Sequence, residues 1–72
     1  MTVFENVLTS YDSKTDTYLT MDDDGLMTLC DGEGQPIEEL GYARVFNSIP
    51  PEPYRFIYDP FEDIYYVPIR SL

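Results

Sequence analysis

The amino-acid sequence predicts one small domain, residues 1–72, of the mainly β (or α+β) class. We expect a small antiparallel meander of about six short strands with at most one short helix. β-branched and aromatic residues, among them seven Tyr and four Phe, recur in short runs that are typical of strands. Asp, Gly and Pro separate these runs and favour tight turns. The hydrophobic fraction of 43% exceeds that of a disordered acidic tail, so the chain is expected to fold.

The last third of the chain contains the clearest strand pair. Residues 54–58 (YRFIY) and 64–69 (IYYVPI) are rich in β-branched and aromatic side chains, and residues 59–63 separate them. The separating segment begins with Asp-Pro, which suits the first two positions of a type I turn. We therefore predict a hairpin with a five-residue loop, in which Tyr58 lies opposite Ile64.

The first half of the chain predicts a second hairpin and an earlier strand. Residues 17–21 and 26–30 have the composition of strands, and residues 22–25 form the turn between them, where Asp-Gly allows the positive φ of a tight turn. Upstream, residues 3–9 are expected to form a strand and residues 13–16 the turn that follows it. We expect no linker and no internal repeat.

The segment between these two hairpins is less regular. Residues 36–40, with Pro first and two acids near the start, predict one helical turn that Gly41 ends. Residues 42–46 (YARVF) alternate as a further strand. Residues 49–53 contain three prolines, which favour a rigid, extended connection inside the domain.

The residue content argues against the usual catalytic and cofactor sites, and we predict no enzyme and no cofactor. There is no histidine, which is the commonest general base and metal ligand, and Cys30 has no second cysteine with which to form a disulfide in the chain. We expect Cys30 to pack as a small apolar residue. Lys14, the only lysine, lies in a polar turn, and Gly32 and Gly34 lie among acids that would repel phosphate.

A calcium-binding loop is a weaker alternative. If Gly25 is aligned with the loop glycine of an EF-hand, Asp22 and Asp24 occupy two ligand positions. The first ligand position then holds Thr20, and the last holds Asp31 in place of the bidentate glutamate. Strand-like segments also stand where the motif requires helices, so we predict no metal site.

Net charge is the strongest functional signal in the sequence. Fourteen acidic and four basic residues give a net charge of −10, which repels nucleic acid and anionic membranes and attracts basic surfaces. Because the sequence has neither a signal peptide nor an apolar run of membrane-spanning length, we expect a cytoplasmic protein. Two plainer interpretations stay open: the acids keep an aromatic-rich protein in solution, or they reflect adaptation to high salt.

Carboxylates held on a folded framework can imitate the phosphate backbone of a nucleic acid. Acids on neighbouring strands and turns can form a two-dimensional pattern near phosphate spacing, because same-face residues of a strand lie about 7 Å apart. In this chain the acids extend from Glu5 to Asp63 and alternate with residues that build the fold. On charge density, the predicted partner-binding acids are Asp22, Asp23, Asp24, Asp31, Glu33, Glu38 and Glu39.

In length, charge, absence of histidine, single cysteine and tyrosine content, the whole chain resembles small acidic phage-encoded inhibitors, including DNA-mimic anti-restriction and anti-CRISPR proteins. The resemblance contains no shared motif and transfers no functional residue. It implies a non-enzymatic inhibitor, a monomer or small homo-oligomer in the host cytoplasm, that covers the nucleic-acid-binding surface of a basic host protein. Neither nucleic acid itself nor a membrane is an expected partner.

A protein-interaction module that binds through aromatic contacts is the alternative function. Tyrosine is enriched at binding hot spots because it combines a large area with a hydroxyl group. An immunity protein, an antitoxin or a transcription regulator belongs to this class. Core packing is the competing explanation for many rings, above all for Phe56, Tyr58 and Tyr66. The residues predicted for this alternative patch are Phe61, Glu62, Asp63 and Tyr65.

Overall fold

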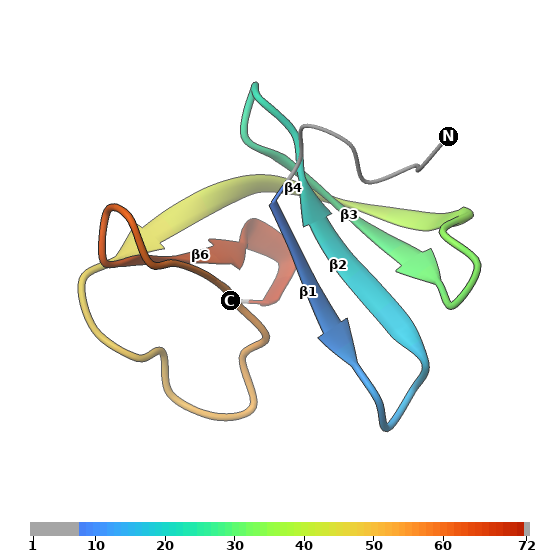
Figure 1. The fold of residues 1–72 in the computed structure, drawn as a ribbon. Coiled ribbons are helices and arrows are strands. Elements are labelled where there is room, and N and C mark those ends of the chain that lie inside the picture. Colours follow the sequence, from blue (N-terminus) through green and yellow to red (C-terminus); the bar gives the residue numbers. More distant parts are fainter. Residues whose placement is uncertain (1–7, 72) are drawn as a thin grey trace.

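A computed structural model describes residues 8–71 of the chain, which form one antiparallel sheet (Figure 1). The predicted mainly β class is therefore confirmed. None of the described residues belongs to a helix that is long and apolar enough to cross a membrane. In chain order the elements are β1 (Leu8–Asp12), β2 (Thr17–Met21), β3 (Leu26–Asp31), β4 (Pro36–Phe46), β5 (Ile57–Asp59), β6 (Ile64–Pro68) and the 3-10 helix η1 (Ile69–Ser71).

The strand order across the sheet is β1-β2-β3-β4-β6-β5. Strands β1 to β4 form a meander in which each strand pairs with the next. In the last hairpin it is the second strand, β6, that pairs with β4, so β6 lies between β4 and β5. The eleven-residue strand β4 spans both halves of the sheet (Figure 1). The edge strands β1 and β5 also contact each other, so the sheet curves until its two edges meet along an open seam.

The core lies on the inner face of this curved sheet. Leu19 and Met21 alternate along β2, and Met27 lies directly opposite Met21 on β3. Ile57 joins them from β5 and is almost fully buried. Truncation of Leu19 to alanine is expected to reduce the free energy of unfolding by about 2–5 kcal/mol. The partly buried side chains around this cluster are Leu8, Leu40, Ala43 and Tyr66.

The predicted turns at 13–16 and 22–25 are confirmed, and so is the strand that follows each of them. β2 matches the predicted strand 17–21, and β3 extends the strand predicted at 26–30 by one residue. The strand predicted at 3–9 is displaced, because β1 continues to Asp12. Residues 3–7 of that prediction lie outside the described residues.

The predicted helical turn at 36–40 is wrong, because these residues begin strand β4. An isolated helical turn is unfavourable, whereas here the backbone groups pair with β3, with Glu38 opposite Leu29. Gly41 adopts a φ of +88° inside this strand, and a side chain there would overlap Ile69 of η1. Gly41 therefore lets η1 pack on β4 instead of ending a helix.

The predicted register of the last hairpin is wrong by one residue. Tyr58 lies opposite Tyr65, and Asp59 lies opposite Ile64, so the loop has four residues. Asp59 stays in the ladder because its carboxylate caps the turn, accepting a hydrogen bond from the Phe61 N–H at 3.0 Å. A one-residue shift exchanges the faces of a strand, which places Tyr58 on the outside of the sheet.

Candidate functional site

An aspartate opens each of the four hairpin turns in the described part of the chain. In every case its Oδ1 atom accepts a hydrogen bond, at 2.9–3.0 Å, from the backbone N–H two residues further on. This geometry is the Asx-turn, which favours Asp at the first position of a turn. Part of the negative charge therefore serves turn formation. These aspartates are Asp12, Asp22, Asp31 and Asp59.

Two of the predicted partner-binding acids belong to this set. Asp22 also accepts the N–H of Leu26 at 3.0 Å, and Asp31 also accepts the N–H of Gln35 at 2.9 Å. Both residues are half-buried. One oxygen of each carboxylate is directed back at its own turn.

The other five predicted acids are exposed, but the fold does not gather them on one face. Consecutive turns of a meander lie at opposite ends of the sheet, so the β2–β3 and β3–β4 turns are separated by the length of β3. On β4, neighbouring residues point to opposite faces, and Glu38 forms an ion pair with Arg70 at 2.9 Å. These five acids are Asp23, Asp24, Glu33, Glu38 and Glu39.

The β1–β2 and β3–β4 turns meet at one end of the sheet, which we term the double-turn end. The Asp16 carboxylate lies so close to Gly32 that any side chain on Gly32 would overlap it. The two turns bring four acids to this end, of which Asp12 and Asp16 were not predicted from the sequence. The acids of the double-turn end are Asp12, Asp16, Asp31 and Glu33.

The β5–β6 hairpin carries a group of exposed and half-buried rings that we term the aromatic hairpin. Phe61, at the turn, is 96% exposed. The rings of Tyr58 and Tyr65 are 4.8 Å apart between centroids, and Phe56 packs edge-on against Tyr65 at 5.3 Å. Tyr66 instead packs against the core, as predicted. The aromatic hairpin consists of Phe56, Tyr58, Phe61 and Tyr65.

The alternative patch predicted from the sequence is thus part of a larger surface. Phe61, Glu62 and Asp63 share one turn, and Tyr65 follows on β6. With Tyr58 opposite Ile64, as the sequence predicts, Tyr65 would lie on the other face from Tyr58, whereas the two rings are in contact. The signal that was overlooked is the aspartate pair around the turn, which sets the loop at four residues.

The Tyr58 hydroxyl donates a hydrogen bond to Asp63 Oδ1 at 3.0 Å. This bond raises the pKa of Tyr58, and desolvation and the negative charge of Asp63 raise it further. The pKa of Tyr11 is raised for the same reason, because its hydroxyl donates to Asp16 Oδ1 at 2.7 Å. Burial is the main cause that raises the pKa of Tyr66.

The β1–β2 and β5–β6 hairpins are two copies of one local eight-residue pattern. Residues 11–18 (YDSKTDTY) and 58–65 (YDPFEDIY) share the pattern Tyr-Asp-x-x-x-Asp-x-Tyr. Both pairs of cross-strand tyrosine rings lie 4.8 Å apart, and the second aspartate has a φ of 53° in one copy and 55° in the other. The copies differ at the tip, where Lys14 occupies the position of Phe61.

The turn 22–25 is a hairpin turn between β2 and β3, so the helices that an EF-hand requires are not present there. Among residues 8–71, no three His, Cys, Asp or Glu side chains are grouped as metal ligands. Cys30 is buried, as expected.

No protein-family model matches this chain, and no curated protein or solved structure matches it. The likeness to small acidic phage-encoded inhibitors therefore remains one of composition.

Proposed function

We propose that this protein binds another protein, docking the aromatic hairpin on a basic surface that contains an apolar pocket. One observation carries the proposal: the Phe61 side chain is 96% exposed at a turn. Burial of a phenylalanine side chain stabilises a complex by about 1.5–3 kcal/mol. Phe61 is therefore the anchor, and the tilted, contacting rings of Tyr58 and Tyr65 extend the contact area.

The turn holds Phe61 in a defined position, which favours binding. The Phe61 N–H donates to Asp59 Oδ1 at 3.0 Å, and the Asp63 N–H donates to the Asp59 carbonyl at 2.8 Å. A loop that is ordered before association loses less conformational entropy when the complex forms.

Charge selects a basic partner. Glu62 and Asp63 are exposed beside Phe61, in a protein whose net charge is −10. Complementary charge raises the association rate and disfavours acidic partners, while the buried ring supplies most of the affinity.

Polyanion mimicry is the second candidate, with a nucleic-acid-binding host protein as the target. The double-turn end favours it, because four carboxylates meet there. Asp12 lies 3.9 Å from Arg55, but no ion pair within residues 8–71 involves Asp16, Asp31 or Glu33. In this case binding weakens strongly between about 50 and 200 mM salt and is reversed by added DNA.

Affinity capture from a nuclease-treated bacterial lysate tests the proposal, with the wild-type protein beside Phe61→Ala. If the aromatic hairpin binds the partner, the wild type captures it. Phe61→Ala then binds it more weakly by at least about 2 kcal/mol, or about thirtyfold in Kd. Lys14→Ala, at the matching position of the β1–β2 hairpin, is the control and keeps the affinity. A specific partner that both variants bind equally well contradicts docking through Phe61.

A second pair of variants tests mimicry. Glu33→Lys changes the double-turn end, and Asp23→Lys changes the opposite end of the sheet by the same charge. If mimicry uses the double-turn end, Glu33→Lys weakens the captured complex clearly more than Asp23→Lys does. Equal effects of the two variants would show that only the overall charge matters.

A further inference from the structure

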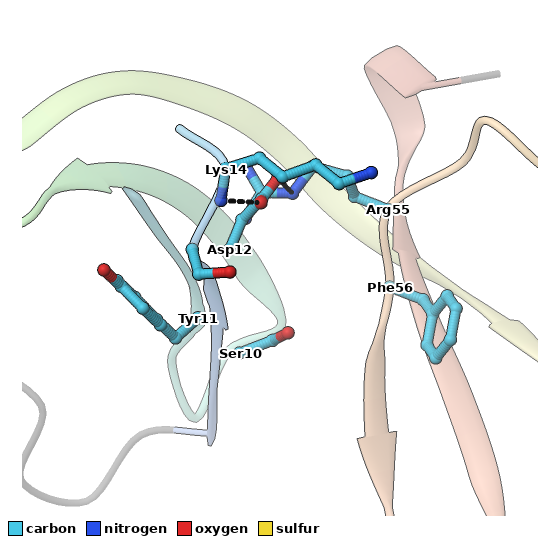
Figure 2. Close-up of a pocket in the computed structure, with 7 residues that line it drawn as sticks. Ser10, Tyr11, Asp12, Lys14, Arg55 and Phe56 are labelled. Atoms are coloured by element: carbon cyan, nitrogen blue, oxygen red, sulfur yellow. Dashed lines mark hydrogen bonds and ion pairs between the residues drawn. The ribbon is translucent and has the colours of Figure 1, made fainter. Parts of the chain in front are cut away.

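A groove of about 310 Å³ follows the open seam of the sheet (Figure 2). One wall is the end of β1 and the turn after it, and the other is the segment that leads into β5. The groove exists because the edges β1 and β5 touch without pairing in the ladder. Its volume lies at the small end of the range for small-molecule sites, about 300–1,000 Å³.

The groove concentrates positive charge in an acidic protein. Lys14 and Arg55 both line it, although the chain has only four basic residues. Asp12 is the one acid among the lining residues, so the formal charge of the lining is positive while that of the protein is −10. This local excess is the reverse of what the overall composition predicts.

Arg55 is held in place by contacts that leave part of its guanidinium free. Its Nε lies 3.9 Å from Asp12 Oδ2, and its Nη1 donates to Thr17 Oγ1 at 3.3 Å. A guanidinium has five N–H donors in a planar fork, so donors remain for a planar or tetrahedral oxyanion. The side chain is 31% exposed.

Lys14 and Phe56 complete the groove. The Lys14 ammonium extends above Arg55, and no ion pair within residues 8–71 involves it (Figure 2). On the facing walls lie the Ser10 hydroxyl and the Phe56 ring (Figure 2). The Phe56 ring extends away from Ser10, beyond the segment that carries it (Figure 2), so the two cations and the hydroxyl lie toward one side of the groove and Phe56 borders the other.

We propose that this groove binds a small organic oxyanion, whose phosphate or carboxylate group contacts Arg55 and Lys14 and whose apolar part lies against Phe56. Phe61 does not line the groove, although Phe56 belongs to both the groove and the aromatic hairpin. The site does not depend on the proposed docking function. The net charge of the protein opposes the approach of an anion, so the attraction comes from the two cations at contact distance. Screening by salt reduces the opposing long-range repulsion more than this contact.

Titration of the isotopically labelled protein with phenyl phosphate, benzoate and uncharged benzyl alcohol, followed by NMR, tests the site. Saturable shifts at Lys14, Arg55 and Phe56 are expected with an anion and not with the alcohol. Tighter binding of phenyl phosphate identifies phosphate as the group recognised, and tighter binding of benzoate identifies carboxylate. No saturation with either anion, or equal shifts with benzyl alcohol, overturns the proposal.

Two variants of equal charge separate the groove from general electrostatics. Lys14→Gln removes a cation that lines the groove, whereas Arg44→Gln removes an exposed cation of β4 that does not line it. Because Lys14→Gln loses one charge-assisted contact, its Kd for the anion is expected to rise about tenfold. Arg44→Gln is expected to change the affinity by less than about twofold. Equal weakening in both variants, with folding unchanged by circular dichroism, contradicts a specific site.

Discussion

Single aspartate residues explain much of the acidity of this protein. Four open hairpin turns with their carboxylates, and Asp16 and Asp63 close two of these turns with positive φ. Aspartate is enriched several-fold among non-glycine residues in that conformation, because its short polar side chain bonds locally. The charge of these residues is therefore available to a partner, but the fold alone is sufficient reason for their presence.

Neighbouring aspartates of one turn are expected to differ in their effect on stability. Asp22→Ala leaves the N–H groups of Asp24 and Leu26 without their acceptor, which lowers the free energy of unfolding by about 1–2 kcal/mol. Asp23→Ala removes an exposed carboxylate and changes stability by less than about 0.5 kcal/mol. Urea denaturation of the two variants measures the difference. Equal stabilities would show that the Asp22 cap contributes nothing.

The hydrogen bond between Tyr58 and Asp63 makes stability depend on alkaline pH. Because the pKa of Tyr58 is raised in the folded protein, its contribution is complete below the unfolded value of about 10 and is lost as the pH rises through the folded value. Asp63→Asn keeps an acceptor and tolerates positive φ but removes the charge, so the pKa of Tyr58 is expected to fall. NMR titration of the Tyr58 ring measures it, with Asp23→Asn as the control. An unchanged pKa in Asp63→Asn would show that the negative charge of Asp63 does not contribute to raising the pKa of Tyr58.

At the level of elements, the two matched hairpins share the residues that build the turn and differ in the residues at its tip. The tyrosine pair and the two aspartates are common to both copies, and they determine the register, the turn and the ring contact. The three tip residues differ completely, with Ser-Lys-Thr in one copy and Pro-Phe-Glu in the other. We therefore expect the common positions to be sufficient for the hairpin fold and the tips to differ in what they bind.

Exchange of the tips tests this division. Replacement of residues 60–62 by Ser-Lys-Thr is expected to keep the fold and to remove docking through the aromatic hairpin. The opposite graft, Pro-Phe-Glu at residues 13–15, is expected to produce a second docking tip. Circular dichroism reports the fold, and the affinity for the captured partner reports the function. An unfolded first variant would show that Phe61 or its neighbours stabilise the hairpin itself.

For the whole molecule, mutual repulsion among carboxylates opposes folding. Within residues 8–71 there are two ion pairs, Asp12–Arg55 and Glu38–Arg70, against a net charge of −10 for the chain. The core is also small, with its central cluster drawn from β2, β3 and β5. A domain of this size has little stability in reserve.

Added salt is therefore expected to stabilise the protein. Sodium chloride screens the repulsion over distances of about 10 Å at 0.1 M, which raises the Tm. Thermal unfolding followed by circular dichroism, in low and moderate salt, measures the change. A Tm that falls on addition of salt would mean that the two ion pairs contribute more than the repulsion.

The sequence by itself determined the strand class, the turns at 13–16 and 22–25, and strands β2 and β3. These features depend on local chemistry, since alternation of side chains and Asp-Gly or Asx turns act over a few residues. The same reasoning was insufficient for residues 36–40. Their weak helical pattern predicts a turn of helix, but pairing with β3 makes them a strand.

Only the tertiary structure decided how the elements meet. The insertion of β6 beside β4, the double-turn end and the groove with Lys14 and Arg55 all join residues that are distant in the sequence. Such contacts follow from burial of the core face and closure of the curved sheet. A short stretch of sequence does not predict either of these. For that reason the acids, the rings and the two groove cations acquire a possible function only from where the sheet places them.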